Sequence, residues 1–180
     1  MSKSAYSTPG KKGKFDKHII VVWVDNEAGV LARVVGLFSG RGYNIESLAV
    51  AEVDQKQNIS RITIVTTGTP QVIDQIKLQL KKLVPVHKVA DFKREDKNVI
   101  FKEMALFKFV ANNKKLISAL NACRNYNPVV LDQTKKSQVI QITALRREID
   151  KMSKNLTKFG LVSVSRTGAV AMTRGSDVFK

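Results

Sequence analysis

A short loop between a strand-like run and a helix-like run carries residues that could hold a small amino acid. Asn26 offers a carbonyl oxygen and an amide NH₂, and Gly29 would let the backbone approach a ligand closely. The first-turn N–H groups of the following helix have no intrahelical partners, and the helix dipole favours an anion such as a carboxylate. The same residues also suit a capped helix start, in which Asn26 satisfies backbone groups and Gly29 relieves strain.

Patterns typical of catalysis are absent from the sequence. There is no Gly-rich phosphate loop, no Ser or Cys beside a plausible His, and no cluster with metal-ligand spacing. The two histidines, His18 and His87, are far apart, and the single Cys123 excludes an internal disulfide framework. The carboxylates Asp25 and Glu27 are more simply turn residues. We therefore expect no enzyme chemistry from this chain alone.

Hydrophobic periodicity predicts the elements that position the loop. His18–Val24 is a β-branched apolar run typical of a buried strand, and the apolar stripe of residues 30–38 predicts a helix that ends by Gly42. The other elements of this half are strands at residues 44–54, 60–67 and 86–92, and a helix with Thr69-Pro70 at its start and Pro85 after its end. This β-α-β-β-α-β order is that of a ferredoxin-like unit.

The pattern recurs more weakly after a charged linker at residues 93–100. Strands are predicted at residues 104–110, 129–134, 138–143 and 161–165, and helices at residues 114–124 and 146–156. We therefore predict an α+β protein with two tandem ferredoxin-like βαββαβ domains, at residues 18–92 and 101–180. Because open sheet edges tend to be paired or covered, we expect dimerisation through the sheets.

The net charge of +16 admits nucleic acid, an anionic membrane or an acidic protein as a partner. Residues 1–17 are basic and poor in apolar side chains, which predicts a disordered tail without the apolar core of a signal peptide. No apolar run approaches the ~20 residues that span a bilayer. We expect a cytoplasmic protein that does not contact membranes.

A β-α-β-β-α-β sheet is also the scaffold of RNA-recognition domains, which stack bases on aromatic residues of the first and third strands. Here the third strand, residues 60–67, has no aromatic residue, and the first has only Trp23. Sequence-specific RNA binding is therefore disfavoured, although a basic nucleic-acid-binding module stays an alternative.

Three segments carry a resemblance to a known family. They are Asn26–Leu31 (NEAGVL), Arg33–Phe38 (RVVGLF) and Arg41–Leu48 (RGYNIESL), and the likeness continues through Ser60-Arg61, Gln75–Val84, Glu103–Leu106 and Arg166–Met172. Together they closely resemble the regulatory (small) subunit of acetohydroxyacid synthase, also called acetolactate synthase. The resemblance covers nearly everything after residue 17.

The resemblance implies an ACT domain followed by the C-terminal domain of the family. Such subunits have no catalytic role: they bind the catalytic (large) subunit, raise its activity and confer feedback inhibition by a branched-chain amino acid, usually valine. This places the chain in valine, leucine and isoleucine biosynthesis. Thiamine diphosphate, Mg²⁺ and FAD are expected only in the catalytic partner. A free-standing amino-acid-sensing ACT protein that regulates another enzyme is the alternative.

In that family the effector lies between two ACT domains of a homodimer. The resemblance implies that one chain supplies a loop and the other a strand start. The loop residues are Asn26, Ala28, Gly29, Val30 and Leu31, and the strand-start residues are Asn44 and Ile45. The loop would hold the charged groups of the amino acid with Asn44 as a second polar anchor, and Val30, Leu31 and Ile45 would shape an apolar pocket.

Overall fold

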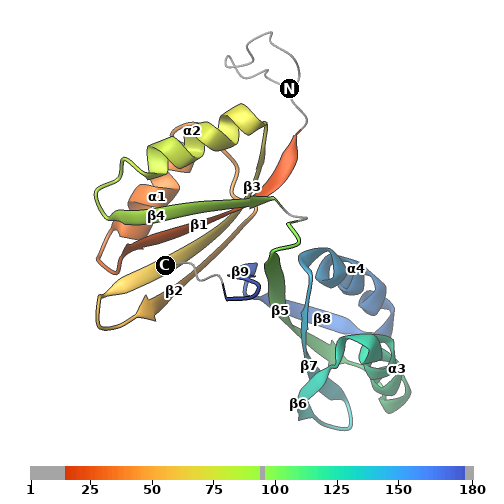
Figure 1. Ribbon diagram of the computed structural model, residues 1–180. Coiled ribbons are helices and arrows are strands. Elements are labelled where there is room, and N and C mark those ends of the chain that lie inside the picture. Colours follow the sequence, from red (N-terminus) through yellow and green to blue (C-terminus); the bar gives the residue numbers. More distant parts are fainter. Residues whose placement is uncertain (1–14, 94–95, 177–180) are drawn as a thin grey trace.

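The computed structural model describes residues 15–93 and 96–176, which form two lobes (Figure 1). The strands of the first lobe are β1 (Asp16–Asp25), β2 (Ser47–Asp54), β3 (Ile59–Gly68) and β4 (Val86–Lys93), and its helices are α1 (Val30–Ser39) and α2 (Pro70–Leu80). The strands form an antiparallel sheet in the order β2-β3-β1-β4. The predicted ferredoxin-like order of this half is confirmed.

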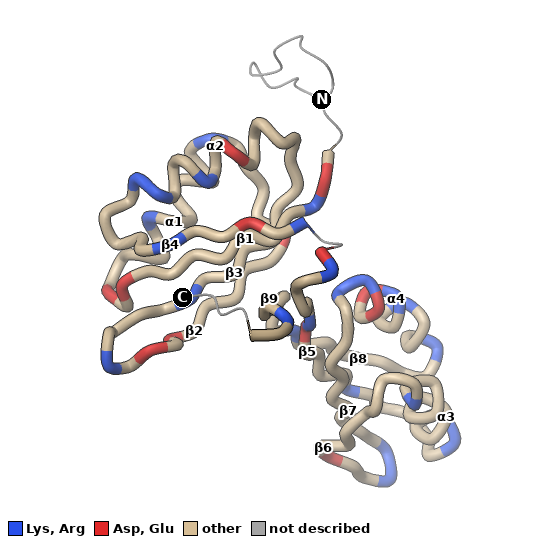
Figure 2. The backbone as a smooth tube through the Cα atoms, viewed as in Figure 1, with Lys and Arg blue, Asp and Glu red and all other residues tan. Residues whose placement is uncertain are grey.

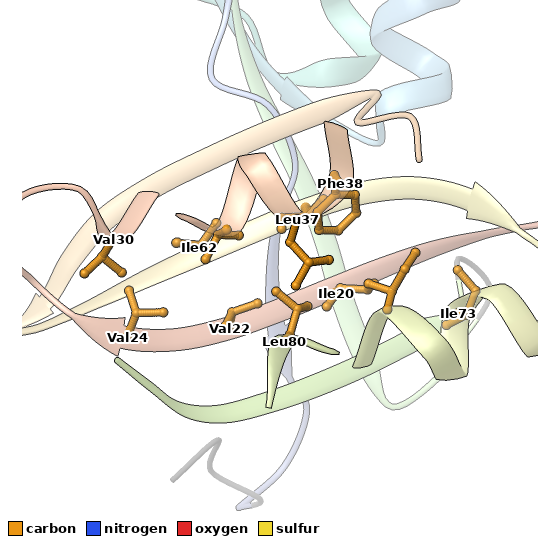
Figure 3. Close-up of a cluster of buried hydrophobic side chains, with 12 residues drawn as sticks. Ile20, Val22, Val24, Val30, Leu37, Phe38, Ile62, Ile73 and Leu80 are labelled. Carbon is orange, nitrogen blue, oxygen red and sulfur yellow. The ribbon is translucent and has the colours of Figure 1, made fainter. Parts of the chain in front are cut away.

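Both helices of the first lobe cover one face of the sheet because their apolar stripes face the same strands. Leu37 and Phe38 of α1 pack with Ile20 and Val22 of β1, and Leu80 of α2 closes the same core (Figure 3). The start of α2 is set by local chemistry, since its cap residue accepts a hydrogen bond from a first-turn N–H and a proline follows it.

The second lobe repeats this arrangement with its own core. Its elements are β5 (Val99–Val110), α3 (Asn113–Cys123), β6 (Val129–Gln133), β7 (Ser137–Ala144), α4 (Arg146–Leu156) and β8 (Leu161–Arg166), with short 3-10 turns at Arg124–Tyr126 and Thr157–Phe159. The sheet order is β6-β7-β5-β8. Phe107 and Phe109 of β5 pack with Leu116 of α3 and Ile149 of α4 in this second core. The prediction of two tandem βαββαβ units is confirmed.

An unpredicted piece of the second lobe covers the remaining face of the first sheet. β5 begins at Val99 rather than at residue 104, and its first residues pair with an additional strand, β9 (Val170–Thr173). Val99, Ala169 and Ala171 are buried against Ile19, Val21 and Val65 of the first sheet. This contact explains why the apolar run of β1 does not alternate: both of its faces are buried.

Other predicted boundaries also differ from the structure. Asp16 and Lys17 belong to β1 rather than to the tail of residues 1–17, of which residues 1–14 lie outside the described residues. β2 begins at Ser47 instead of residue 44, so Asn44 and Ile45 lie in the connection before the strand. The linker of residues 93–100 is shorter than predicted, since β4 ends at Lys93 and β5 begins at Val99.

Candidate effector-binding site

The first turn of α1 has no side-chain cap. Gly29 is its N-cap residue, with φ 83° in the left-handed region, and no side chain accepts a hydrogen bond from the first turn. By contrast, Thr69 caps α2 and Asn112 caps α3 through their side-chain oxygens. The Gly29 carbonyl accepts from the N–H of Arg33 at 3.0 Å, so the helix starts at this point. The N–H of Val30 donates to the carbonyl of Glu27 at 3.4 Å, so the first-turn N–H groups of Leu31 and Ala32 are the ones available to an anion.

Asn26 is held by β3 and does not cap the helix. Its Oδ1 accepts a hydrogen bond from Ser60 Oγ at 3.0 Å, and its backbone N–H donates to the carbonyl of Asn58 at 2.7 Å. The Nδ2 group of this exposed residue has no recorded acceptor in residues 15–93 or 96–176. The interpretation of Asn26 as an ordinary helix cap is therefore wrong, and its amide NH₂ remains available beside the loop.

The apolar residues of the loop differ in what they offer a ligand. Leu31 is 40% exposed in the first turn of α1, and Ala28 is also exposed. Val30 is only 3% exposed because its side chain packs into the first core (Figure 3). Val30 therefore brings only its backbone to the predicted site. Ile45 is half-buried against the same core, so Leu31 is the apolar side chain most open to a ligand.

The second group of predicted residues lies between α1 and β2. Thr66 Oγ1 donates a hydrogen bond to the carbonyl of Asn44 at 2.7 Å, which ties this segment to β3 and leaves the residue exposed. Glu46 then donates its N–H to the carbonyl of Val65 at 2.8 Å. Thr66 was missed by sequence reasoning because it is distant along the chain and no local pattern marks it.

Within one chain, the two groups of predicted residues lie at opposite ends of β3. Asn26 contacts Ser60 and Asn44 contacts Thr66. A strand rises by about 3.4 Å per residue, so these contacts are about 20 Å apart, far more than one amino acid spans. The two groups could therefore contact the same ligand only across two chains. β2 lies at the edge of the described sheet, with β3 as its one neighbour, which leaves an edge for a second copy.

The segment that carries Asn44 is also bonded to the second lobe. Arg146 Nη2, at the start of α4, donates to the carbonyl of Glu46 at 3.2 Å. The side chain of Glu46 pairs with Lys17 at 2.5 Å, and the N–H of Ala169 donates to Ser47 Oγ at 3.4 Å. A change in the position of this segment would therefore alter its hydrogen bond to Arg146 at the start of α4.

Both histidines have carboxylate partners. His18 Nδ1 lies 2.7 Å from Asp91 Oδ1, and His87 Nε2 lies 2.6 Å from Asp25 Oδ1. Burial raises the pKa of the Cys123 thiol to about 11. No group of three or more potential metal ligands occurs among residues 15–93 and 96–176, and no helix in those ranges is long and apolar enough to cross a membrane.

The sheet face that an RNA-recognition domain would use is covered in this protein. Trp23 of β1 lies beneath Arg61, whose guanidinium carbon is 5.2 Å from the ring centroid, and packs at the edge of the contact with the second lobe. Ile19, Val21 and Val65 on the same face are buried by β5 and β9. This face is therefore not available for base stacking.

Comparisons with known proteins match both lobes. A family model described as the AHAS small subunit-like ACT domain matches residues 20–88, and one described as the small subunit of acetolactate synthase matches residues 102–175. The acetolactate synthase small subunit of Aquifex aeolicus is 38% identical over 165 residues, which are 91% of this chain and 84% of that protein. A probable acetolactate synthase small subunit of Archaeoglobus fulgidus is 34% identical over 160 residues, with coverage of 89% and 98%.

The fold agrees with these matches. The crystal structure of the acetolactate synthase small subunit from Thermotoga maritima superposes with a TM-score of 0.79 at 31% identity, covering 89% of this chain and 99% of that one. Sequence and structural similarity thus extend through the ACT domain of the first lobe and the whole second lobe. The chain belongs to the family of acetolactate synthase small subunits.

Proposed function

We propose that this chain regulates the catalytic subunit of acetolactate synthase: it binds that subunit, raises its activity and makes it sensitive to feedback inhibition by valine or another branched-chain amino acid. Membership of the small-subunit family supports the choice of partner. The observation that carries the effector site is the uncapped first turn of α1 behind the left-handed Gly29. Its N–H groups suit the carboxylate of a free amino acid.

The effector site is proposed to form between two ACT domains of a homodimer. The loop residues Asn26 to Leu31 of one chain would face Asn44 and Ile45 of the other, since one chain keeps these groups about 20 Å apart along β3. An amino acid that bridges two chains stabilises one dimer arrangement over another, and this difference in affinity permits regulation. The hydrogen bond that Arg146 donates to the carbonyl of Glu46 would connect the site directly to the second lobe.

The proposed role of the chain is binding, so no catalytic step is assigned to its residues. We assign thiamine diphosphate, Mg²⁺ and FAD to the catalytic partner. The small subunit contributes surfaces and the effector site, and it acts by changing the conformation of that partner.

The decisive experiment measures acetolactate formation by the cognate catalytic subunit with and without this chain, across a valine titration. The proposal expects a higher rate when the chain is added and a loss of that rate as valine increases, while the purified chain alone forms no acetolactate. Sedimentation of the isolated chain should show at least a dimer. A rate that does not change on addition of the chain would refute the regulatory role, and a valine-binding monomer would refute the two-chain site.

A further inference from the structure

A second candidate site lies between the two lobes. A cavity of about 280 Å³ opens where the buried face of the first sheet meets the start of the second lobe. Ile19 and Val65 of the first lobe and Phe101 of the second line its apolar part. The four basic residues that line it are Lys17, Lys102, Arg146 and Arg147. The cavity is separate from the Asn26–Leu31 loop, so the proposed effector site does not account for it.

The positive charge around this cavity is only partly balanced. Glu46 pairs with Lys17 at 2.5 Å and accepts from Arg146 through its backbone carbonyl. Burial alone would raise the pKa of Glu46, but hydrogen bonds from Lys17 and Thr67 and the nearby charges lower it overall. Lys102 and Arg147 form no salt bridge with any residue in the described ranges. Lys102 and Arg147 are exposed, and an anion that contacts them would offset the repulsion among the like charges that line the cavity.

The start of α4 adds further donors to the same cavity. Leu145, Arg146 and Arg147 line it, and they form the N-cap and first two residues of this 11-residue helix. Glu148 Oε2 accepts from the N–H of Leu145 at 2.9 Å. The N–H groups of Arg146 and Arg147 have no intrahelical acceptor because both residues are in the first turn. Basic residues gather along α4 in the second lobe (Figure 2). The positive end of the helix dipole and the basic side chains therefore both favour an anionic ligand.

We propose that the cavity between the lobes binds a small organic phosphate, with the phosphate held by Lys102, Arg146 and Arg147 and a short apolar group against Phe101 and Val65. Two guanidinium groups and an ammonium group suit the several oxygens of a phosphate, which can accept from each of them at once. The volume of about 280 Å³ lies just below the range of about 300–1,000 Å³ for ligand pockets, so a small molecule fits better than a dinucleotide.

Binding at this cavity would be linked to the proposed effector site. An anion competes with Glu46 for Lys17 and Arg146, and Glu46 follows directly after Asn44 and Ile45. Binding of the phosphate and of valine would therefore alter each other's affinity by the same factor. This coupling rests on the proposed function, whereas the binding of the phosphate does not.

Calorimetric titration of the full chain at low ionic strength tests the site, with phenyl phosphate, inorganic phosphate and benzoate as probes. Phenyl phosphate should bind most tightly, because it combines the phosphate with an apolar group. The double variant Lys102→Gln/Arg147→Gln should weaken its binding by about tenfold or more. Neither residue forms a recorded salt bridge in the described ranges, so the fold is expected to persist.

A matched control removes the same charge elsewhere. Lys135→Gln/Lys136→Gln changes two exposed lysines in the turn before β7 and should leave the affinity for phenyl phosphate within about twofold. Equal losses in the two double variants, or no binding to the unchanged chain, would overturn the proposal. Amide chemical shifts give an independent reading: phenyl phosphate should move those of Lys102, Arg146 and Arg147, and shifts confined to other residues would also overturn it. Titrating the same samples with valine tests the effector site separately, so a failure of phosphate binding can be told from a failure of valine binding.

Discussion

Replacing Gly29 by aspartate would place a carboxylate where the carboxylate of the effector is proposed to bind. No atom other than its chain neighbours lies within 4 Å of the position that a Cβ would take, so the substitution meets no steric barrier. The backbone at φ 83° adds strain of about 1–2 kcal/mol for a residue other than glycine, less for Asp and Asn, which tolerate this region. The fold should therefore survive.

The expected loss of effector affinity comes from charge. Two carboxylates about 5 Å apart repel by about 3 kcal/mol at the effective dielectric constant of about 20 that applies near a protein surface, which lowers affinity about a hundredfold. The matched control is Gly29→Asn, which has nearly the same shape and the same backbone strain without the charge. Valine inhibition of the reconstituted enzyme and calorimetric titration of the isolated chain measure both variants.

We expect the Gly29→Asp protein to activate the catalytic subunit without making it sensitive to valine. The Gly29→Asn protein should retain much of the inhibition by valine. Normal valine inhibition in Gly29→Asp would place the effector elsewhere. Equal losses in the two variants would show that backbone strain, not charge at the end of α1, is responsible. Loss of activation and inhibition together in a folded protein would show that the two functions share this loop.

Asn44→Ala should also lower the affinity for valine, which calorimetric titration measures. Its free energy of unfolding, measured by thermal unfolding, should change by no more than about 0.5 kcal/mol, because the residue is exposed and Thr66 bonds to its backbone carbonyl. Glu103→Ala should destabilise the protein by roughly 3 kcal/mol in urea unfolding, since the 1%-exposed Glu103 binds Arg166 through both carboxylate oxygens. Asp150→Ala, at the exposed side of the same guanidinium, should lower the free energy of unfolding by no more than about 1 kcal/mol. Equal losses of stability in the Glu103 and Asp150 variants would contradict this reasoning. The thiol of Cys123 has a pKa of about 11, so about one part in a thousand is thiolate at pH 8. Cys123 should therefore resist alkylation in the native protein and react after unfolding. Rapid alkylation of the native protein would show that the second core opens.

The order of elements in both lobes was predictable because it depends on local patterns. The apolar stripe of α1, the Thr69-Pro70 start of α2 and the β-branched run of β1 each identify an element from neighbouring residues alone. Gly29 was also recognised locally, as the glycine between a strand and a helix, and the structure gives it the left-handed conformation that favours glycine.

Contacts between distant parts of the chain were not predictable in this way. Nothing near Val99 or Val170 in the sequence indicates that β5 and β9 cover the first sheet, because the contact depends on how the two lobes pack. The sequence likewise could not tell Val30, which is buried in the core, from Leu31, which faces outward, as candidates for a pocket wall.

The amino-acid sequence by itself determined the two ferredoxin-like units and the glycine-containing loop before α1, since periodicity and turn chemistry act over a few residues. Only the tertiary structure decided that Asn26 is held by Ser60, that Asn44 is held by Thr66, and that β3 keeps these two groups about 20 Å apart. It also decided that basic residues of both lobes meet around one cavity. These features arise from side chains brought together by strand pairing and lobe packing, over separations that no local pattern encodes.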